Sequence, residues 1–215
     1  MALTPAEKAS RILPVLAQWY GDVTTELHYR NPYELTIAVI LSAQCTDVRV
    51  NQTTPAFFER FPDFAALAEA TPEEVFSYIK SISYPNSKAQ RLVELARTVM
   101  AKYHGELPRD PEELQKLPGI GRKSANVIAS VLWEAPVIAV DTHVFRVSRR
   151  LGLARGNSPE KVEAELTQII PPEYLGRAHH WLILFGRYHC TARKPKCAAC
   201  PFTSLCEYYQ AQRVE

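Results

Sequence analysis

Residues 117–125 read LPGIGRKSA, with two glycines two positions apart, followed by an arginine and Lys123. Before this stretch, DPEELQKL (110–117) has the composition of a short helix with an aspartate N-cap and a proline in its first turn. After the turn, RKSANVIASVLW (122–133) has the apolar spacing of a second helix. A helix, a Pro-Gly-Ile-Gly turn and another helix together predict a helix-hairpin-helix over residues 111–133.

The glycines and the lysine of this hairpin suggest contact with a phosphate. Gly119 and Gly121 can adopt conformations closed to other residues, and they let a phosphate approach the backbone. The second helix then directs its free N–H groups and the positive end of its dipole at that phosphate. Lys123 lies in the first turn, where the dipole and an expected partial burial favour the neutral amine that a nucleophile requires. The alternatives are a structural turn and a solvated or phosphate-binding lysine.

A second polar feature follows an apolar stretch in VIAVDTHVFRVSRRLGL (137–153). Asp141 lies at the predicted start of a helix that carries Arg146, Arg149 and Arg150. The aspartate is either simply an N-cap or a partly buried carboxylate at the mouth of a cleft. The two interpretations are compatible, because a capping aspartate is held rigidly.

Four segments have the signature of a helix N-terminus: a capping residue, a proline at the first helical position and a glutamate at the third. The cap accepts a bond from a backbone N–H that has no partner within the helix, and the glutamate side chain reaches back. Helix-period apolar residues follow, and only APVIAV (135–140) resembles a strand. The sequence therefore predicts an all-α protein of about ten helices. The cap and glutamate pairs are Thr4 and Glu7, Asn31 and Glu34, Thr71 and Glu74, and Asp110 and Glu113.

The bulk composition is that of an ordinary globular chain of 215 residues, with 47% hydrophobic and 22% charged residues. No signal peptide is evident, and the longest apolar stretch, LTIAVILSA, is far shorter than the roughly 20 residues that span a bilayer. We therefore expect a cytosolic protein that does not enter membranes.

The charge is unevenly distributed, which suggests a domain boundary near residue 135. Residues 1–135 carry 14 Lys and Arg against 16 Asp and Glu, whereas residues 136–215 carry 11 against 7. Such a modest basic excess is compatible with a polyanionic partner and equally with a solvated face. Within 187–196 the basic residues are Arg187, Arg193, Lys194 and Lys196.

Four of the five cysteines lie within the last 26 residues, at the spacing Cys-x6-Cys-x2-Cys-x5-Cys. Structural disulfides are not expected in a cytosolic chain, so this cluster predicts a metal site. Four thiolates suit either tetrahedral zinc or a 4Fe–4S cluster. The presence of a single Cys-x2-Cys pair favours iron–sulfur without proving it. The four are Cys190, Cys197, Cys200 and Cys206.

Taken together, LPGIGRKSANV, IAVDTHVFRV, HHWLILFGRYHC and ARKPKCAACPFTSLC resemble the endonuclease III family of helix-hairpin-helix DNA glycosylases. The likeness extends over nearly the whole chain, including ELTIAVILSAQCTDVRVN and NSKAQRLVELA. It implies two helical domains with DNA in the cleft between them. One is a six-helix barrel at 25–135, and the other combines 1–24 with 136–215 and holds a 4Fe–4S cluster.

The resemblance also implies roles for individual residues. Lys123 matches the nucleophile and Asp141 the essential carboxylate, while the four clustered cysteines ligate the 4Fe–4S cluster. Gln44 matches the residue that enters the space left by a flipped base. The family commonly has a wedge leucine in the loop before NSKA, and here SISYPNSKA places Tyr84 there; the alternative is an exposed loop aromatic. The basic loop between the first two cysteines is implied to touch the phosphate backbone through Arg193, Lys194 and Lys196.

The implied activity is that of a bifunctional glycosylase and AP lyase that removes oxidised pyrimidines from duplex DNA. The damaged base leaves the stack, the Lys123 amine attacks C1′ after Asp141 takes its proton, and a Schiff base forms. β-Elimination then cuts the strand on the 3′ side. We expect a cytoplasmic, nucleoid-associated monomer whose partner is double-stranded DNA with damaged pyrimidines or abasic sites.

Three other functions remain open at this point. A monofunctional mismatch glycosylase would use Lys123 only to hold phosphate. A non-catalytic DNA-binding protein would use its cluster as a redox sensor, and a structural adapter would bind zinc. The pairing of Lys123 with Asp141 argues against a pure DNA binder, since DNA affinity needs no aspartate in an anionic groove.

Overall fold

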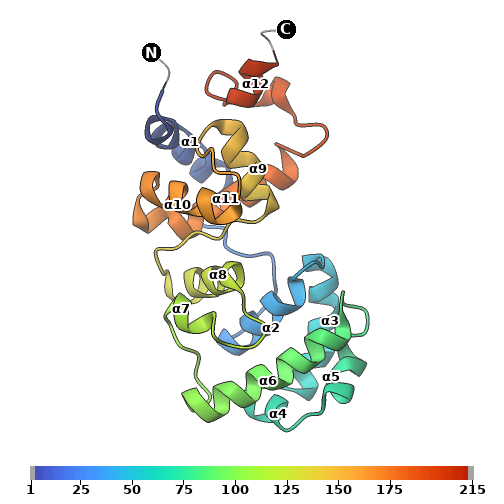
Figure 1. Cartoon of the computed structure of the whole chain (residues 1–215). Helices are drawn as coiled ribbons and strands as arrows, with labels where there is room; N and C mark the ends of the chain where they lie inside the picture. Colours follow the sequence, from blue (N-terminus) through green and yellow to red (C-terminus); the bar gives the residue numbers. More distant parts are fainter. Residues whose placement is uncertain (1–2, 213–215) are drawn as a thin grey trace. The chain divides into compact units, whose positions relative to one another are not determined.

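The computed structural model describes residues 3–212 and is all-α, as the sequence predicts (Figure 1). The described residues form twelve α-helices and two 3₁₀ helices and contain no β-strand. The strand-like segment 135–140 is a connection without regular secondary structure. The outer ends of the predicted second domain, residues 1–2 and 213–215, lie outside the described residues. No helix within 3–212 is long and apolar enough to cross a membrane.

The chain divides into two compact units, Thr25–Trp133 and Met1–Thr24 with Glu134–Glu215. The first unit contains α2 (Pro32–Ser42), α3 (Asp47–Arg60), α4 (Phe64–Ala68), α5 (Pro72–Ile79), α6 (Pro85–Tyr103), α7 (Pro111–Leu114) and α8 (Arg122–Trp133). The second contains α1 (Pro5–Tyr20), α9 (Thr142–Leu151), α10 (Pro159–Ile169), η1 (Pro172–Tyr174), α11 (Leu175–Tyr188), η2 (Cys197–Ala199) and α12 (Glu207–Ala211).

The four predicted N-caps are all present, but the complete capping box forms only at α1. There the Glu7 N–H donates to Thr4 Oγ1 and the Thr4 N–H donates to Glu7 Oε2. At the other three helices each glutamate pairs with a nearby cation, and Glu34 Oε2 also accepts a bond from the Arg30 N–H, one residue before its cap, at 2.7 Å. The caps are Asn31, Thr71 and Asp110, and the ion pairs are Arg30–Glu34, Arg60–Glu74 and Lys116–Glu113.

The core of unit 25–133 is built around α2, in which all nine residues from 33 to 41 are buried. A helix that is apolar on every side must be covered on every side, and α2 packs against α3, α6 and α8. Helix α6 in turn packs against α4 and α5 (Figure 1). The C-terminal end of α2 leads into the loop at residues 43–46, and the loop at residues 80–84 leads into the N-terminal end of α6.

The core of the other unit joins the N-terminal helix to the C-terminal half of the chain. Helix α11 packs against α9 and α1. The fully buried Trp181 donates its Nε1–H to the Gly21 carbonyl at 2.8 Å, which fixes the end of α1 on α11. Phe185 and Phe202 are also fully buried, with ring centroids 5.4 Å apart. Phe202 lies between the third and fourth clustered cysteines, so this contact fixes the cysteine segment on the core.

Candidate active site and cysteine cluster

The hairpin is built by short backbone bonds between α7 and α8. The Leu117 N–H donates to Leu114 O, the Ile120 N–H donates to Leu117 O, and the Ala125 N–H donates to Gly121 O at 2.9 Å. The turn therefore leads directly into the first turn of α8, whose free N–H groups lie at its start. Helix α8 has the bounds that the sequence predicts, whereas α7 ends at Leu114, three residues before the end of the predicted segment 110–117.

The two glycines of the hairpin play different structural roles. Gly119 has a φ of +82°, which L side chains rarely adopt, and a Cβ there would lie 3.3 Å from Arg91 Cβ on α6. Gly121 does not have a positive φ, and a Cβ there would point into open space. The prediction of a conformation closed to other residues is thus correct for Gly119 and wrong for Gly121. At Gly121 the missing side chain leaves the exposed backbone open to approach.

Lys123 lies in the first turn of α8, as the sequence predicts, but its side chain is exposed. The expected partial burial is wrong, because the buried face of α8 consists of other residues, among them Ala125 and Ile128. The side chain of Lys123 is therefore accessible to solvent.

Asp141 is the N-cap of α9, which confirms the capping prediction, and it is half-buried; its place at the mouth of a cleft stays a prediction. Its Oδ1 accepts bonds from the His143 and Val144 N–H groups, each at 2.8 Å. Both bonds end on Oδ1 and do not engage Oδ2. The carboxylate is thus fixed in orientation by backbone donors while one oxygen is left out of the cap. Lys123 and Asp141 belong to different units.

Gln44 and Tyr84 lie on two neighbouring loops of unit 25–133, and both side chains are exposed. Tyr84 retains 65% of its accessible surface, which is unusual for a residue of that size. The two residues have left-handed backbones, with φ values of 55° and 56°. Ser83 Oγ donates to Gln44 O at 2.8 Å, so the structure brings the two loops into direct contact.

The four clustered cysteines all line one pocket in the second unit, with Phe185 among its apolar walls. Within residues 3–212, no three His, Cys, Asp or Glu side chains lie close enough to hold one metal ion. Four thiolates on a single zinc must all approach within about 2.3 Å of it. In a 4Fe–4S cluster each thiolate binds its own iron, so the sulfurs stand further apart around a shared space. Four cysteine thiols around one pocket are the donor set that a 4Fe–4S cluster takes.

Burial controls the protonation of the thiols. Desolvation raises the pKa of the Cys200 thiol to about 11, and it also raises the pKa of Cys206. Both thiols are therefore neutral at pH 7 until a cation stabilises the thiolate, and binding of iron would release their protons.

The basic loop after Cys190 is held by two arginines of α9. Arg150 donates to Thr191 O and Ala192 O, both at 2.8 Å, and its guanidinium lies 4.3 Å from the Tyr208 ring centroid. Arg146 donates to Gly186 O at 2.9 Å and to Cys190 O. These arginines cap the end of α11 and support the loop. The side chains of Arg193, Lys194 and Lys196 are all exposed.

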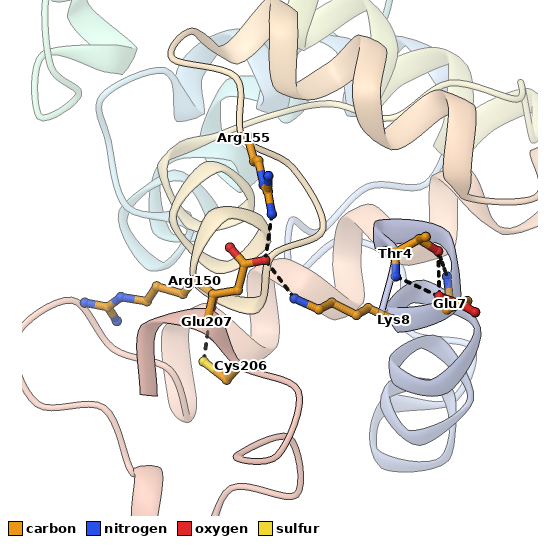
Figure 2. Close-up of polar contacts among 7 residues, drawn as sticks. All are labelled: Thr4, Glu7, Lys8, Arg150, Arg155, Cys206 and Glu207. Atoms are coloured by element: carbon orange, nitrogen blue, oxygen red, sulfur yellow. Dashed lines mark hydrogen bonds and ion pairs between the residues drawn. The ribbon is translucent and has the colours of Figure 1, made fainter. Parts of the chain in front are cut away.

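An ion-pair network next to Cys206 joins three distant parts of the second unit (Figure 2). Glu207 Oε1 pairs with Lys8 Nζ at 2.8 Å and with Arg155 Nη2 at 3.3 Å. Lys8 is only 6% exposed, so its ammonium depends on this partner. Cys206 Sγ lies 3.1 Å from the Arg150 carbonyl.

Sequence reasoning missed the supporting roles of Arg146, Arg150, Lys8 and Glu207. The arginines appeared only as part of a basic helix. Each of these residues is bound to a part of the chain at least 40 residues away. A single sequence contains no local signal for such pairs.

Two family models match the chain. Residues 37–172 match the HhH-GPD superfamily of base excision DNA repair proteins. Residues 190–206 match the iron-sulfur binding domain of endonuclease III, and this range begins and ends on a clustered cysteine.

Individual proteins give the same result. Endonuclease III of Rickettsia felis is 48% identical over 206 residues, which cover 96% of this chain and 97% of the relative. A trapped endonuclease III–DNA covalent intermediate matches with a TM-score of 0.92 and 45% identity, covering 98% of this chain and 99% of that one. A thermostable thymine-DNA glycosylase matches with a TM-score of 0.86 and 25% identity, over 95% and 97% of the two chains. The chain therefore belongs to the endonuclease III family, the DNA glycosylases and AP lyases of base-excision repair that carry a 4Fe–4S cluster.

Proposed function

We propose that the chain removes oxidised pyrimidines from duplex DNA and cleaves the resulting abasic site, with Lys123 as the nucleophile. The observation that carries this proposal is the accessible Lys123 amine at the first turn of the hairpin helix. The hairpin backbone positions a phosphate beside it without reading bases. The endonuclease III with which this chain aligns over its length has been trapped as a covalent intermediate with DNA.

In the proposed reaction, the amine of Lys123 attacks C1′ of the flipped nucleotide, and the C1′–N bond to the damaged base breaks. Asp141 accepts the proton that the attacking amine loses. The sugar ring opens to give a Schiff base between Lys123 and C1′, and β-elimination then expels the 3′ phosphate. Hydrolysis of the Schiff base restores the free amine. The fixed orientation of the Asp141 carboxylate suits this role, since its cap bonds involve only Oδ1.

We assign the remaining residues to DNA binding and to the cluster. Gly119 and Gly121 would bring the backbone close to a phosphate, and Gln44 and Tyr84 would fill the space left by the flipped base. Cys190, Cys197, Cys200 and Cys206 would hold the 4Fe–4S cluster, which when bound cross-links the loop carrying Arg193, Lys194 and Lys196. These three exposed cations would contact the phosphate backbone.

The two units would correspond to the two functional domains. We propose that unit 25–133, predicted as 25–135, is the six-helix barrel with the hairpin at 111–133. The other unit would be the iron–sulfur domain, made of 1–24 with the C-terminal part, predicted as 136–215. We further propose that the enzyme acts as a monomer in the cytoplasm and associates with the nucleoid, where its DNA substrate lies.

Borohydride trapping on duplex DNA with thymine glycol tests the nucleophile. Wild type should form a covalent protein–DNA adduct, and Lys123→Ala should form none. Lys116→Ala is the matched control, because Lys116 lies in the same hairpin and its charge is paired with Glu113 at the surface; its adduct yield should be that of wild type.

The same experiment separates the alternatives. Base release by wild type without an adduct would favour a monofunctional mismatch glycosylase. Binding of the duplex with neither base release nor an adduct, across several lesions, would favour a DNA-binding redox sensor.

A further inference from the structure

Lys88 is a buried cation that joins the ends of two helices in unit 25–133. Its side chain lies in the first turn of α6 and is only 6% exposed. The Nζ donates to Leu41 O at 2.8 Å and to Ala43 O at 2.7 Å. These carbonyls lie at the C-terminal end of α2, where a helix has unbonded carbonyls and a negative dipole end. Burial removes water from the ammonium group and lowers the pKa of Lys88. The two bonds to carbonyls replace the hydration that the ammonium group loses.

Further bonds hold the two loops that these helix ends carry, the Gln44 loop (residues 43–46) and the Tyr84 loop (residues 80–84). Ser83 Oγ donates to Gln44 O at 2.8 Å. The other side of the Tyr84 loop is bound to α3, where Arg49 Nη1 reaches Ser81 O at 3.4 Å and Thr53 Oγ1 lies 3.2 Å from Ser81 Oγ. Each loop is therefore anchored within three residues of its exposed tip.

The exposed tips have unfavourable backbone conformations. Gln44 and Tyr84 have φ values of 55° and 56°, and neither is a glycine. A left-handed conformation costs an ordinary residue about 1–2 kcal/mol. Such conformations persist only where the surrounding structure imposes them, and they concentrate at functional sites. Here the bonds of Lys88 and Ser83 end on the carbonyls of Ala43 and Gln44, at the first of these tips.

We propose that Lys88 is a positioning residue that presets Gln44 and Tyr84 in the geometry in which they enter the DNA when a base flips out. This inference rests on the proposed function, in which both residues fill the vacated space. Because folding has already imposed the left-handed backbones, the loops need not reorganise when the base pair opens. Lys88 acts through the backbone; its burial excludes it from phosphate contact.

The test compares Lys88→Met with Arg97→Met. Arg97 is a control on the same helix, since it also donates to two backbone carbonyls at the C-terminal end of a helix, Ala68 O and Ala70 O next to α4, but it supports neither loop. Single-turnover release of thymine glycol is measured in two duplexes. In one the lesion is paired with adenine, and in the other it faces an abasic analogue, so that no base pair has to open.

Lys88→Met should slow release from the paired duplex by about tenfold, the size of one weakened stacking contact, and from the unpaired duplex by less than about twofold. Arg97→Met should change the two rates equally or not at all. The salt dependence of DNA binding should be that of wild type, since no phosphate contact is lost. Equal slowing of both duplexes by Lys88→Met, or an altered salt dependence, would overturn the proposal.

Two further results keep this proposal distinct from the proposed function. If Lys88→Met does not fold, as judged by its thermal transition, Ser83→Ala decides instead, because it removes only the bond to Gln44 O. If Ser83→Ala slows the release of thymine glycol only from the paired duplex, the result supports preset loops. If it slows release from both duplexes equally, or from neither, the proposal is overturned. If wild type releases thymine glycol from neither duplex, the proposed function itself fails.

Discussion

The two units support their exposed loops by related but different means. In unit 25–133, one buried lysine binds carbonyls at the end of α2, and the loop tips keep left-handed backbones. In the other unit, Arg146 and Arg150 bind carbonyls at the end of α11 and along the cysteine loop. We propose that this loop has a second support, the 4Fe–4S cluster that its cysteines would hold. The first unit thus fixes its loops with the chain alone, whereas the proposed support of the second includes a cofactor.

The largest expected effect is on the rate of base release, and it distinguishes two aspartate N-caps, one in each unit. Asp141→Asn keeps a good capping residue and removes the charge, so stability should change little while base release falls about 10³-fold. Asp110→Asn makes the same change at the cap of α7 and should leave the rate unchanged. The measurements are single-turnover base release and thermal unfolding. An unaffected rate in Asp141→Asn would show that this carboxylate is only a cap.

The next largest effect is on cluster absorbance and DNA affinity, and it distinguishes two cysteines, one in each unit. Cys200→Ser should remove the visible absorbance of the cluster and lower DNA affinity about 100-fold, because the basic loop loses its cross-link. Cys45→Ser, in the unit without the cluster, should preserve both the absorbance and the affinity. Absorbance spectra and titration of labelled duplex provide the two readouts. Full affinity in colourless Cys200→Ser protein would mean that the arginines alone support the loop.

A smaller effect is expected on the free energy of unfolding, and it distinguishes two glycines with positive φ. Gly119→Ala should destabilise the protein by about 1–2 kcal/mol, mainly through backbone strain. Gly152→Ala should cost about 2–3 kcal/mol, because its Cβ would also collide with the Lys8–Glu207 ion pair. Chemical denaturation measures both free energies of unfolding, and Gly121→Ala should be near wild type. If Gly119→Ala lowered the free energy of unfolding more than Gly152→Ala, the collision with the Lys8–Glu207 ion pair would be excluded as the main cost.

The smallest effect is expected on the salt dependence of DNA binding, when single surface lysines are replaced. Lys194→Ala should reduce the slope of log affinity against log salt by about 1, as expected for one lost phosphate contact. Lys116→Ala, whose charge is paired in the hairpin, should leave the slope unchanged. Binding titrations at several salt concentrations provide the comparison. Equal slopes for wild type and Lys194→Ala would exclude this lysine from the phosphate contacts.

The features that could be predicted from the sequence depend on residues a few positions apart. The N-caps at Thr4, Asn31, Thr71 and Asp110, and the hairpin at 111–133, each involve one or two helical turns. The cysteine spacing is equally local, and it indicated a metal site before any tertiary structure was known. Asp141 was recognisable as a cap for the same reason.

The failed predictions depended on neighbours that local patterns do not reveal. The glutamates at 34, 74 and 113 pair with nearby cations, and Glu34 reaches back to the N–H of Arg30 instead of that of its cap. Lys123 is exposed because other residues of α8 face the core, and Gly121 needs no special conformation because its backbone is open.

The sequence by itself determined the all-α class, the helix starts, the hairpin and the four-cysteine site, because short-range hydrogen bonds and spacing specify them. Only the tertiary structure decided which cations support which loops. Lys88 reaches carbonyls 45 and 47 residues away, and Lys8 reaches Glu207 across 199 residues. Such contacts form only when packing brings distant segments together, and the free energy of burying their charges depends on that packing.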